Sequence, residues 1–327
     1  MTYPQTKFRS AFTLVELLVV MTVIAILIGM LSAAVIPAFK RAREASIQVE
    51  MKQIELAIES FKNKYGFYPP SFESGTNAAS TAVGISSAAD LMRFVNRISP
   101  NHAEGSASGH GTESRLEHWY DEVGQYLDQE SSLVFWLSGI CNNKQYPITG
   151  GLTGFPPIAA HPFGTDGIER DILFDFKNGQ LFGDETDEIV QKGTTGIPVV
   201  LRASATVPGF ILEYRQAYGP KSGDLLFKYR DAATYDLGGT AADNLAYCDG
   251  PADGSAPAAP YAFANPNSFQ LITFGMDGLS GAPGNWHRCG FADVTVGTST
   301  FVGFHAADNL CNFADGFRLE KWAADNE

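Results

Sequence analysis

The sequence predicts an α+β protein in which one long N-terminal helix packs on a small antiparallel sheet. Three observations predict this class: an apolar run near the N-terminus, a helix-periodic run that follows it directly, and short strand-like runs in the second half of the chain. The first two runs form the helix and the third forms the sheet. A mixed insertion of loops and short helices lies between them, and a C-terminal loop closes the chain.

The apolar run from Leu17 to Phe39 is long enough to cross a bilayer as a helix, because a span needs roughly 20 residues. One carboxylate, Glu16, lies at its start, in the first turn, where negative charge suits the helix dipole. A charge in hydrocarbon costs on the order of 3 kcal/mol and usually marks function. Lys7 and Arg9 precede the run, so the amino end is predicted in the cytoplasm and the bulk of the chain outside the membrane.

The helix is predicted to continue outward as an amphipathic segment. Apolar residues recur there in steps of four and three, the spacing of one helix face: Ile47, Met51, Ile54, Ile58, Phe61 and Tyr65. We expect this face to pack on the sheet and the helix to end at Gly66. Pro37 lies inside the helix and is predicted to kink it or to loosen a turn.

The remainder of the chain is predicted to contain short elements. Residues 88–98 and 113–140 are expected to be helical, within an insertion that is otherwise rich in small and polar residues. Strands are expected at residues 172–176, 198–201, 210–214, 225–229 and 269–274, with a long loop at 231–260. We assign the tryptophans, Trp119 and Trp136 among them, to core packing rather than to carbohydrate stacking.

Charge and cysteine content exclude some classes of function. The net charge is −13, and phosphate binding needs basic patches, so we expect no nucleic-acid binding. The four cysteines form no CxxC motif: Cys141, Cys248, Cys289 and Cys311. Two disulfides are possible in an oxidising compartment. We favour Cys289–Cys311, because both lie in one C-terminal loop region, and free buried thiols are the alternative.

The amino-terminal segment resembles the type IV prepilin signature of pilins and of type II secretion pseudopilins. A short basic leader, Phe12, Glu16 four residues later and the apolar run carry the resemblance. It implies that a prepilin peptidase cuts between Ala11 and Phe12 and that the new amino terminus is methylated. It also implies that Glu16 meets the amino terminus of a neighbouring subunit, so that subunits join at one stagger. Ala11 departs from the family, which almost always has Gly before the cut.

A second resemblance covers the end of the long helix. It is carried by Ile54, Ala57, Phe61, Gly66, Tyr68 and Pro69, a pattern similar to that of the major, or G-type, pseudopilins of type II secretion. The two resemblances imply a prepilin leader at residues 1–11, a transmembrane and assembly helix at 12–40, and an amphipathic half of the helix at 41–68. An enlarged head follows, with the insertion at 69–165 and the antiparallel sheet and C-terminal loop at 166–327.

The resemblance implies a structural subunit rather than an enzyme. The chain is expected to be a single-pass inner-membrane protein with its head in the periplasm, assembled into a periplasmic pseudopilus that drives type II protein secretion. Expected partners are further copies of the chain, minor pseudopilins, the prepilin peptidase, and the inner-membrane assembly platform with its secretion ATPase. The alternative in the same class is a type IV pilin of a surface fibre for adhesion, motility or DNA uptake.

More distant alternatives also follow from the sequence. The apolar run is longer than the roughly 7–15 residues of a secretory signal peptide, which disfavours that interpretation, and a plain membrane anchor is a further alternative. The chain contains no GxSxG, P-loop or HExxH motif. A membrane-anchored hydrolase or sugar-binding protein, active through residues 72–260, is therefore the least favoured hypothesis.

By the same resemblance the C-terminal loop binds calcium. Asp277 follows the last predicted strand, and Asp308, Asn309 and the pair Asn312–Phe313 lie further on, at positions similar to the acidic and closing residues of the calcium loop in major pseudopilins. Calcium takes roughly six to eight oxygen ligands in flexible geometry, which carboxylates and amides supply. Asn309 stands where the family has an acid, so the ligand charge is lower. Ordinary turn residues are the alternative.

Overall fold

The computed structural model describes residues 13–72, 84–107, 112–150 (except 123, 125, 126, 128 and 139), 170–183 (except 178 and 179), 262–273 and 309–314. It also describes short strand segments between residues 191 and 301. The chain divides into two compact units, Met1–Ser46 and Ile47–Glu327. Helix α1, Leu14–Tyr65, contributes to both units and is unbroken at Pro37.

The first unit contains the apolar half of α1. The helix is long and apolar enough to cross a membrane, and nearly all of its described large apolar side chains are exposed. The exposed ones range from 45% exposed at Ile24 to 78% at Leu14. Such a surface is unfavourable in water, because exposed apolar area carries a free-energy cost of roughly 25 cal/mol per Å². This half of α1 therefore requires a bilayer or other apolar helices around it.

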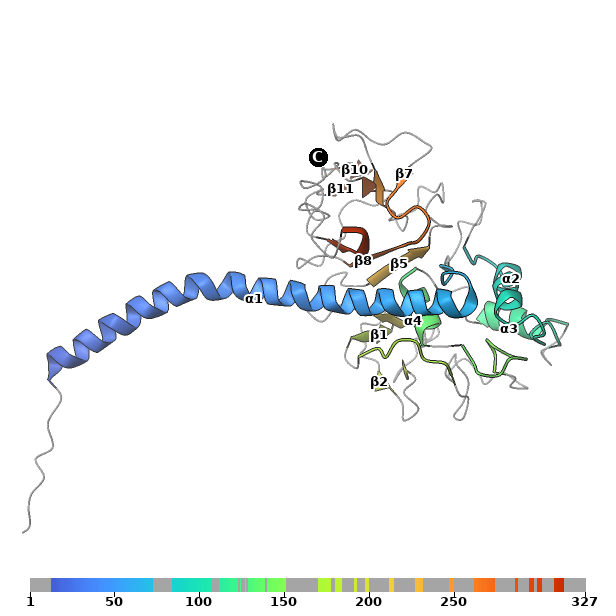
Figure 1. Ribbon diagram of the computed structural model, residues 1–327, viewed down its shortest axis with the longest axis horizontal. Helices are drawn as coiled ribbons and strands as arrows, with labels where there is room; N and C mark the ends of the chain where they lie inside the picture. The colour runs from blue at the N-terminus through green and yellow to red at the C-terminus, as the bar shows by residue number, and fades with distance from the viewer. Residues whose placement is uncertain are drawn as a thin grey trace, which may run out of the picture. The chain divides into compact units, whose positions relative to one another are not determined.

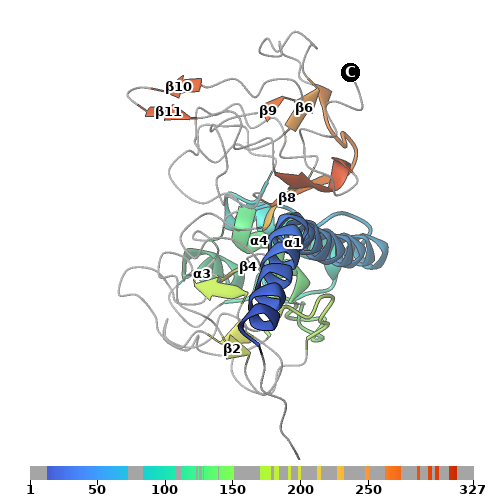
Figure 2. The same cartoon turned by 90° about the vertical axis from the view of Figure 1, so that its left-hand side faces the viewer.

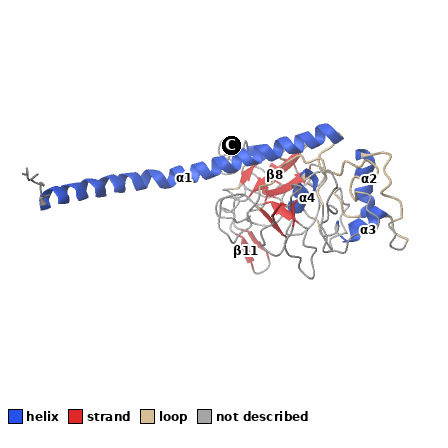
Figure 3. Ribbon diagram, turned by 90° about the horizontal axis from the view of Figure 1, so that it is seen from below, coloured by secondary structure: helices blue, strands red, loops and turns tan. Residues whose placement is uncertain are grey.

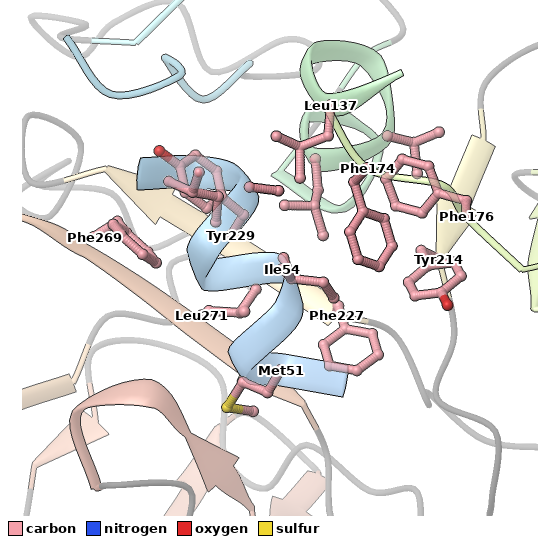
Figure 4. Packing of buried hydrophobic residues seen from close by; sticks show 14 of the residues in the cluster. Met51, Ile54, Leu137, Phe174, Phe176, Tyr214, Phe227, Tyr229, Phe269 and Leu271 are labelled. Atoms are coloured by element: carbon pink, nitrogen blue, oxygen red, sulfur yellow. The ribbon is translucent and has the colours of Figure 1, made fainter. Parts of the chain in front are cut away.

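The second unit is built on the helix-periodic stripe of α1. Its first part, from Ile47 to Ile58, is buried against a three-stranded antiparallel sheet of order β12-β8-β5 (Figure 1). The strands are β5 Phe227–Asp231, β8 Phe269–Thr273 and β12 Leu310–Cys311. Alternate residues of the sheet meet the helix, as Figure 4 shows for Phe227, Tyr229, Phe269 and Leu271. The predicted packing of a long helix on a small antiparallel sheet is thus confirmed.

The end of the stripe builds a second core with the insertion. Phe61 lies among aromatic residues of the insertion, including Phe72, Trp119 and Trp136. The helices are α2 Ala88–Ile98, α3 Arg115–Glu122 and α4 Gln129–Leu137, and α2 and α3 lie side by side (Figure 3). Both helical predictions in the insertion are confirmed, with 113–140 holding two helices. Helix α4 joins the cores, since Leu133 packs in the first and Trp136 in the second.

The strand expected at 172–176 is not formed. Its backbone instead caps α4: the N–H groups of Leu173 and Phe174 both donate to the carbonyl of Leu137, each at 3.1 Å. The helix end needs such donors, because its last carbonyls have no partner within the helix. Phe174 and Phe176 are buried beside Tyr214. The alternation of apolar residues in this segment therefore indicated which side chains are buried, and not that the segment pairs with a strand.

The remaining strands form small separate pairings. Strand β1 Leu181–Gly183 pairs with β4 Leu212–Tyr214, β2 Gln191–Lys192 with β3 Pro198–Val199, and β10 Val294–Val296 with β11 Ser299–Phe301. Strand β6 Tyr247–Asp249 pairs with β7 Ala262–Phe263 on one side and on the other with β9 Trp286–His287, which is labelled beside it in Figure 2. The prediction that residues 231–260 are all loop is wrong, because β6 lies within them.

The cysteine pairing that we favoured is wrong. Cys141 and Cys311 are free, buried thiols, which is the alternative drawn from the sequence. Cys311 lies opposite Ile272 of β8 in β12, an edge strand of the three-stranded sheet, and is fully buried. Burial raises the pKa of both thiols. Cys289 lies outside the described residues, and Cys248 is in β6.

The shared stripe of α1 leads to a stability prediction. Replacing the fully buried Ile54 with Ala is expected to destabilise the head by about 2–5 kcal/mol, because it leaves a cavity between helix and sheet. The measurement is denaturant unfolding of the full chain in detergent, followed by tryptophan fluorescence. Val49→Ala is the control: Val49 lies on the same helix but is 59% exposed, so a change of about 0.5 kcal/mol or less is expected. Equal losses in the two variants would contradict this packing.

Candidate functional site

The start of α1 is closed by reciprocal hydrogen bonds between Thr13 and Glu16. The backbone N–H and the hydroxyl of Thr13 both donate to Glu16 Oε2 at 2.9 Å, and the Glu16 N–H donates to Thr13 Oγ1 at 3.2 Å. This is a capping box, which satisfies backbone donors that no helical turn can pair. Glu16, whose charge we had assigned to assembly, therefore has partners within its own chain. The Thr-x-x-Glu spacing is readable in the sequence, and our interpretation overlooked it.

The expected cleavage site lies just before this cap. Ala11 and Phe12 are outside the described residues, and Thr13 is the first residue of the described segment. The cap uses the peptide N–H of Thr13, which stays a peptide N–H if the chain is cut between Ala11 and Phe12. The new amino group would be carried by Phe12, one residue before the cap. The geometry thus allows processing without loss of the helix start.

The other end of α1 is held by a turn and two prolines. Gly66, with φ of +83°, follows the helix and adopts the left-handed backbone that glycine tolerates. The carbonyl of Pro69 accepts a hydrogen bond from the Tyr229 hydroxyl at 2.7 Å, and that of Pro70 accepts one from Trp136 Nε1 at 2.8 Å. One bond reaches the sheet and the other reaches α4, so this turn ties both cores to the end of α1.

Residues 171–177 form a strap that runs antiparallel to α1. Asp171 pairs with Lys64 near the end of the helix, and Lys177 pairs with the buried Glu50 at 2.7 Å. The two helix positions are 14 residues apart, about 21 Å at a rise of 1.5 Å. The strap covers this distance in six extended residues, about 20 Å. Opposite charges at the two ends therefore specify one orientation of the strap on the helix.

Glu50 is the centre of a buried polar cluster on the packed face of α1. Besides Lys177, it accepts hydrogen bonds from Gln180 Nε2 at 3.1 and 3.2 Å and from the Tyr214 hydroxyl at 2.6 Å. Burial and the neighbouring Glu50 carboxylate raise the pKa of Tyr214, so this hydroxyl stays protonated and remains a donor. The cluster satisfies a carboxylate that would otherwise be costly to bury.

A second buried carboxylate, Glu104, holds the insertion together. Its oxygens accept from the backbone N–H of Ile148 at 2.8 Å, the N–H of Thr149 at 2.9 Å and the Thr149 hydroxyl at 2.7 Å. Burial raises the pKa of Glu104, an effect that outweighs the opposing one of its hydrogen bonds. The geometry leaves this carboxylate fully engaged, so its role is structural.

Only one of the residues expected to bind calcium can be placed. Asp277 and Asp308 lie outside the described residues. Asn309 is fully buried directly before β12. The side-chain amide of Asn312 forms hydrogen bonds with the backbone of β8. Its Oδ1 accepts from the N–H of Leu271 at 2.9 Å, and its Nδ2 donates to the carbonyl of Phe269 at 3.2 Å. The described part of the chain contains no group of three or more His, Cys, Asp or Glu side chains that could hold a metal ion.

The comparisons with known proteins concern the same end of α1. Residues 6–32 match the family model described as the prokaryotic N-terminal methylation motif. The match includes Ala11, Phe12, Thr13 and Glu16, together with the first part of the apolar run. No curated protein and no solved structure matches the chain.

Glu104 leads to a prediction about pH. Its carboxyl pKa is raised above the ordinary 4.5 in the folded chain, so the folded state keeps a proton that the unfolded state releases. The contribution to stability is complete below about pH 4.5 and is lost as pH rises through the raised pKa. Glu104→Gln cannot titrate, and it should gain about 2–4 °C in unfolding midpoint relative to the wild-type chain between pH 4 and pH 7. Circular dichroism melting of the full chain in detergent measures this change.

The control for this experiment is Asn142→Asp, which places an exposed carboxylate in the loop after α4. Its midpoint should follow that of the wild-type chain at every pH. If the Glu104→Gln and wild-type midpoints also stay parallel, Glu104 does not hold its proton in the folded chain.

Proposed function

We propose, from the premise that the N-terminal methylation motif marks a type IV pilin-like protein, that this chain is the structural subunit of a pseudopilus that drives type II protein secretion. The motif implies processing by a prepilin peptidase and polymerisation into a fibre. The observation that carries the proposal is that one helix holds both the larger part of the matched motif, from Leu14 onward, and the main packing face of the head. A pull on the apolar half of α1 is therefore transmitted to the folded head.

The end of α1 supports the pseudopilin assignment within this class. Gly66, Tyr68 and Pro69, which resemble the major pseudopilins, occupy the turn that fastens the helix to the sheet and to α4. Tyr68 is itself held, because its hydroxyl donates to Glu59 at 2.9 Å and Lys62 lies 3.9 Å from its ring centroid. A fibre subunit needs a rigid joint at this place, since the head must move with its helix.

Assembly follows from the exposed apolar helix and its cap. In the monomer Glu16 is satisfied by Thr13. In the fibre the positive amino terminus of a neighbouring Phe12 would approach Glu16, and the two charges would neutralise one another in an apolar surrounding only at one stagger. The apolar faces of α1 would then be covered by other copies of α1. The head would lie in the periplasm and the helix in the inner membrane before assembly.

The proposed role is mechanical and involves neither catalysis nor nucleic acid. The partners proposed are further copies of the chain, minor pseudopilins, the prepilin peptidase, and the inner-membrane assembly platform with its secretion ATPase. A type IV pilin of a surface fibre is the second candidate, and the methylation motif favours it equally.

Glu16 provides the test of this function. A strain lacking the gene should retain exported proteins in the periplasm, and the wild-type gene should restore secretion. Glu16→Ala should not restore it and should yield no fibres, because the assembly charge is lost. Intact mass should show each processed variant without residues 1–11 and with one added methyl group.

The matched control is Glu117→Ala. Glu117 makes the same capping box with Ser114 at the start of α3, at 2.8 and 3.2 Å, but lies in the head. Glu117→Ala should secrete and polymerise like the wild-type chain. Normal fibres from Glu16→Ala would overturn the assembly mechanism, whereas surface filaments with no retained cargo in the deletion strain would favour the pilin.

We also propose that the C-terminal loop binds calcium through Asp277, Asp308 and Asn309. Two carboxylates and an amide are donors that calcium accepts, and the loop is anchored where Asn312 bonds to β8. Calcium at 100 times its Kd should stabilise the head by about 2.7 kcal/mol, seen as a raised unfolding midpoint that a chelator reverses. Asp308→Asn should lose this response and Asp121→Asn, an exposed acid of α3, should keep it. An unchanged midpoint for the wild-type chain would end the proposal.

A further inference from the structure

Helix α1 carries six basic side chains, and two of them have no partner in the described part of the chain. Lys52 pairs with Glu55 at 2.9 Å, Lys64 pairs with Asp171, and Lys62 lies over Tyr68. Arg43 also has an interaction partner. Lys40 and Arg41 are exposed, and within the described residues the structure gives them no ion pair. In this respect they differ from the other four basic residues of α1.

The position of Lys40 and Arg41 makes their lack of a partner informative. They follow the apolar run directly, after Phe39. Basic residues beside a membrane span are favoured on the cytoplasmic side, yet the proposed topology places these two on the exported side. Glu44 follows close by but has an interaction of its own. The positively charged side chains of Lys40 and Arg41 are therefore available to bind a negatively charged group that does not belong to α1.

The head supplies that charge. In the processed chain, which lacks residues 1–11, residues 12–46 contain three basic residues and two acids, a net charge of +1: Lys40, Arg41, Arg43, Glu16 and Glu44. The full chain has a net charge of −13 and loses Lys7 and Arg9 with the leader, so the processed chain has −15 and the unit from Ile47 to Glu327 has −15 − 1 = −16. Each copy in a fibre thus presents a strongly acidic head and, just before it in sequence, a short basic segment.

We infer that Lys40 and Arg41 form a docking site for the acidic head of a neighbouring copy in the fibre. The inference rests on the proposed fibre function and adds a second contact, outside the membrane, to that of Glu16. A neighbouring head is favoured over lipid headgroups as the occupant, because a subunit drawn into a fibre leaves the bilayer while adjacent heads remain beside it. The contact depends on salt, since screening acts over about 10 Å at 0.1 M salt and about 3 Å at 1 M.

Zero-length crosslinking tests the docking directly. Fibres are assembled from equal amounts of nitrogen-14 and nitrogen-15 full-length chain and treated with a carbodiimide, which joins a lysine amine to a carboxylate. We expect Lys40 to be linked to an Asp or Glu of the head in a differently labelled copy. The yield of this link should fall severalfold at 1 M salt. Links of Lys40 found only within one copy would overturn the inference.

Charge variants provide the second measurement. The double variant Lys40→Gln and Arg41→Gln should reduce the amount of fibre roughly tenfold at about 0.1 M salt, because two exposed ion pairs per contact are lost. The control double variant is Lys52→Gln and Lys144→Gln, which removes two exposed positive charges from the unit Ile47–Glu327 and should leave fibre yield unchanged. Exchanging the two cations, Lys40→Arg with Arg41→Lys, should preserve assembly.

The outcomes separate this inference from the function on which it rests. A wild-type chain that forms no fibre overturns both. Normal fibres from the Lys40→Gln and Arg41→Gln variant overturn the docking site alone and leave the fibre function standing. If that variant also loses its preference for bilayers containing phosphatidylglycerol over phosphatidylcholine, lipid headgroups are the occupant instead.

Discussion

The buried stripe of α1 from Ile47 to Tyr65 is the surface on which both hydrophobic cores are built. Its first part packs on the β12-β8-β5 sheet, and its last turns pack on the aromatic residues of the insertion. The same helix exposes apolar side chains from Leu14 to Phe39. One continuous element therefore has to satisfy two environments, an interior on one side of the head and an apolar surrounding near the amino terminus.

Polar contacts give this packing its orientation. Apolar side chains alone would tolerate a shift of the helix along the sheet, because hydrophobic burial is not directional. The pairs Glu50–Lys177 and Lys64–Asp171 oppose such a shift, since each of the two helix residues has its partner at one place on the strap. The bonds from Tyr229 and Trp136 to the two proline carbonyls act in the same way at the helix end. The head is thus joined to its helix at several places.

This construction suits a subunit whose helix transmits force. In the single chain the acid of the methylation motif, Glu16, already has a hydrogen-bonding partner, because it caps α1 together with Thr13. The proposed exchange of Thr13 for a neighbouring amino group replaces one set of polar contacts by another, so neither state leaves the carboxylate without partners. The inferred docking of Lys40 and Arg41 on the acidic head of a neighbouring copy would add a second polar contact between copies, through side chains that are exposed in the single chain.

Local patterns in the sequence determined much of this protein, because helix periodicity, caps and turns depend on residues only a few positions apart. The stripe of α1, its end at Gly66 and the bounds of α2 could all be read in this way, and the capping box of Glu16 was readable too. The tertiary structure alone decided what residues 172–176 do, since alternation reports burial and not which group receives each N–H. It also decided the partners of Glu50, which lie 127 to 164 positions away, and the free state of Cys311. Contacts over such separations depend on how the whole chain folds, and no local pattern encodes them.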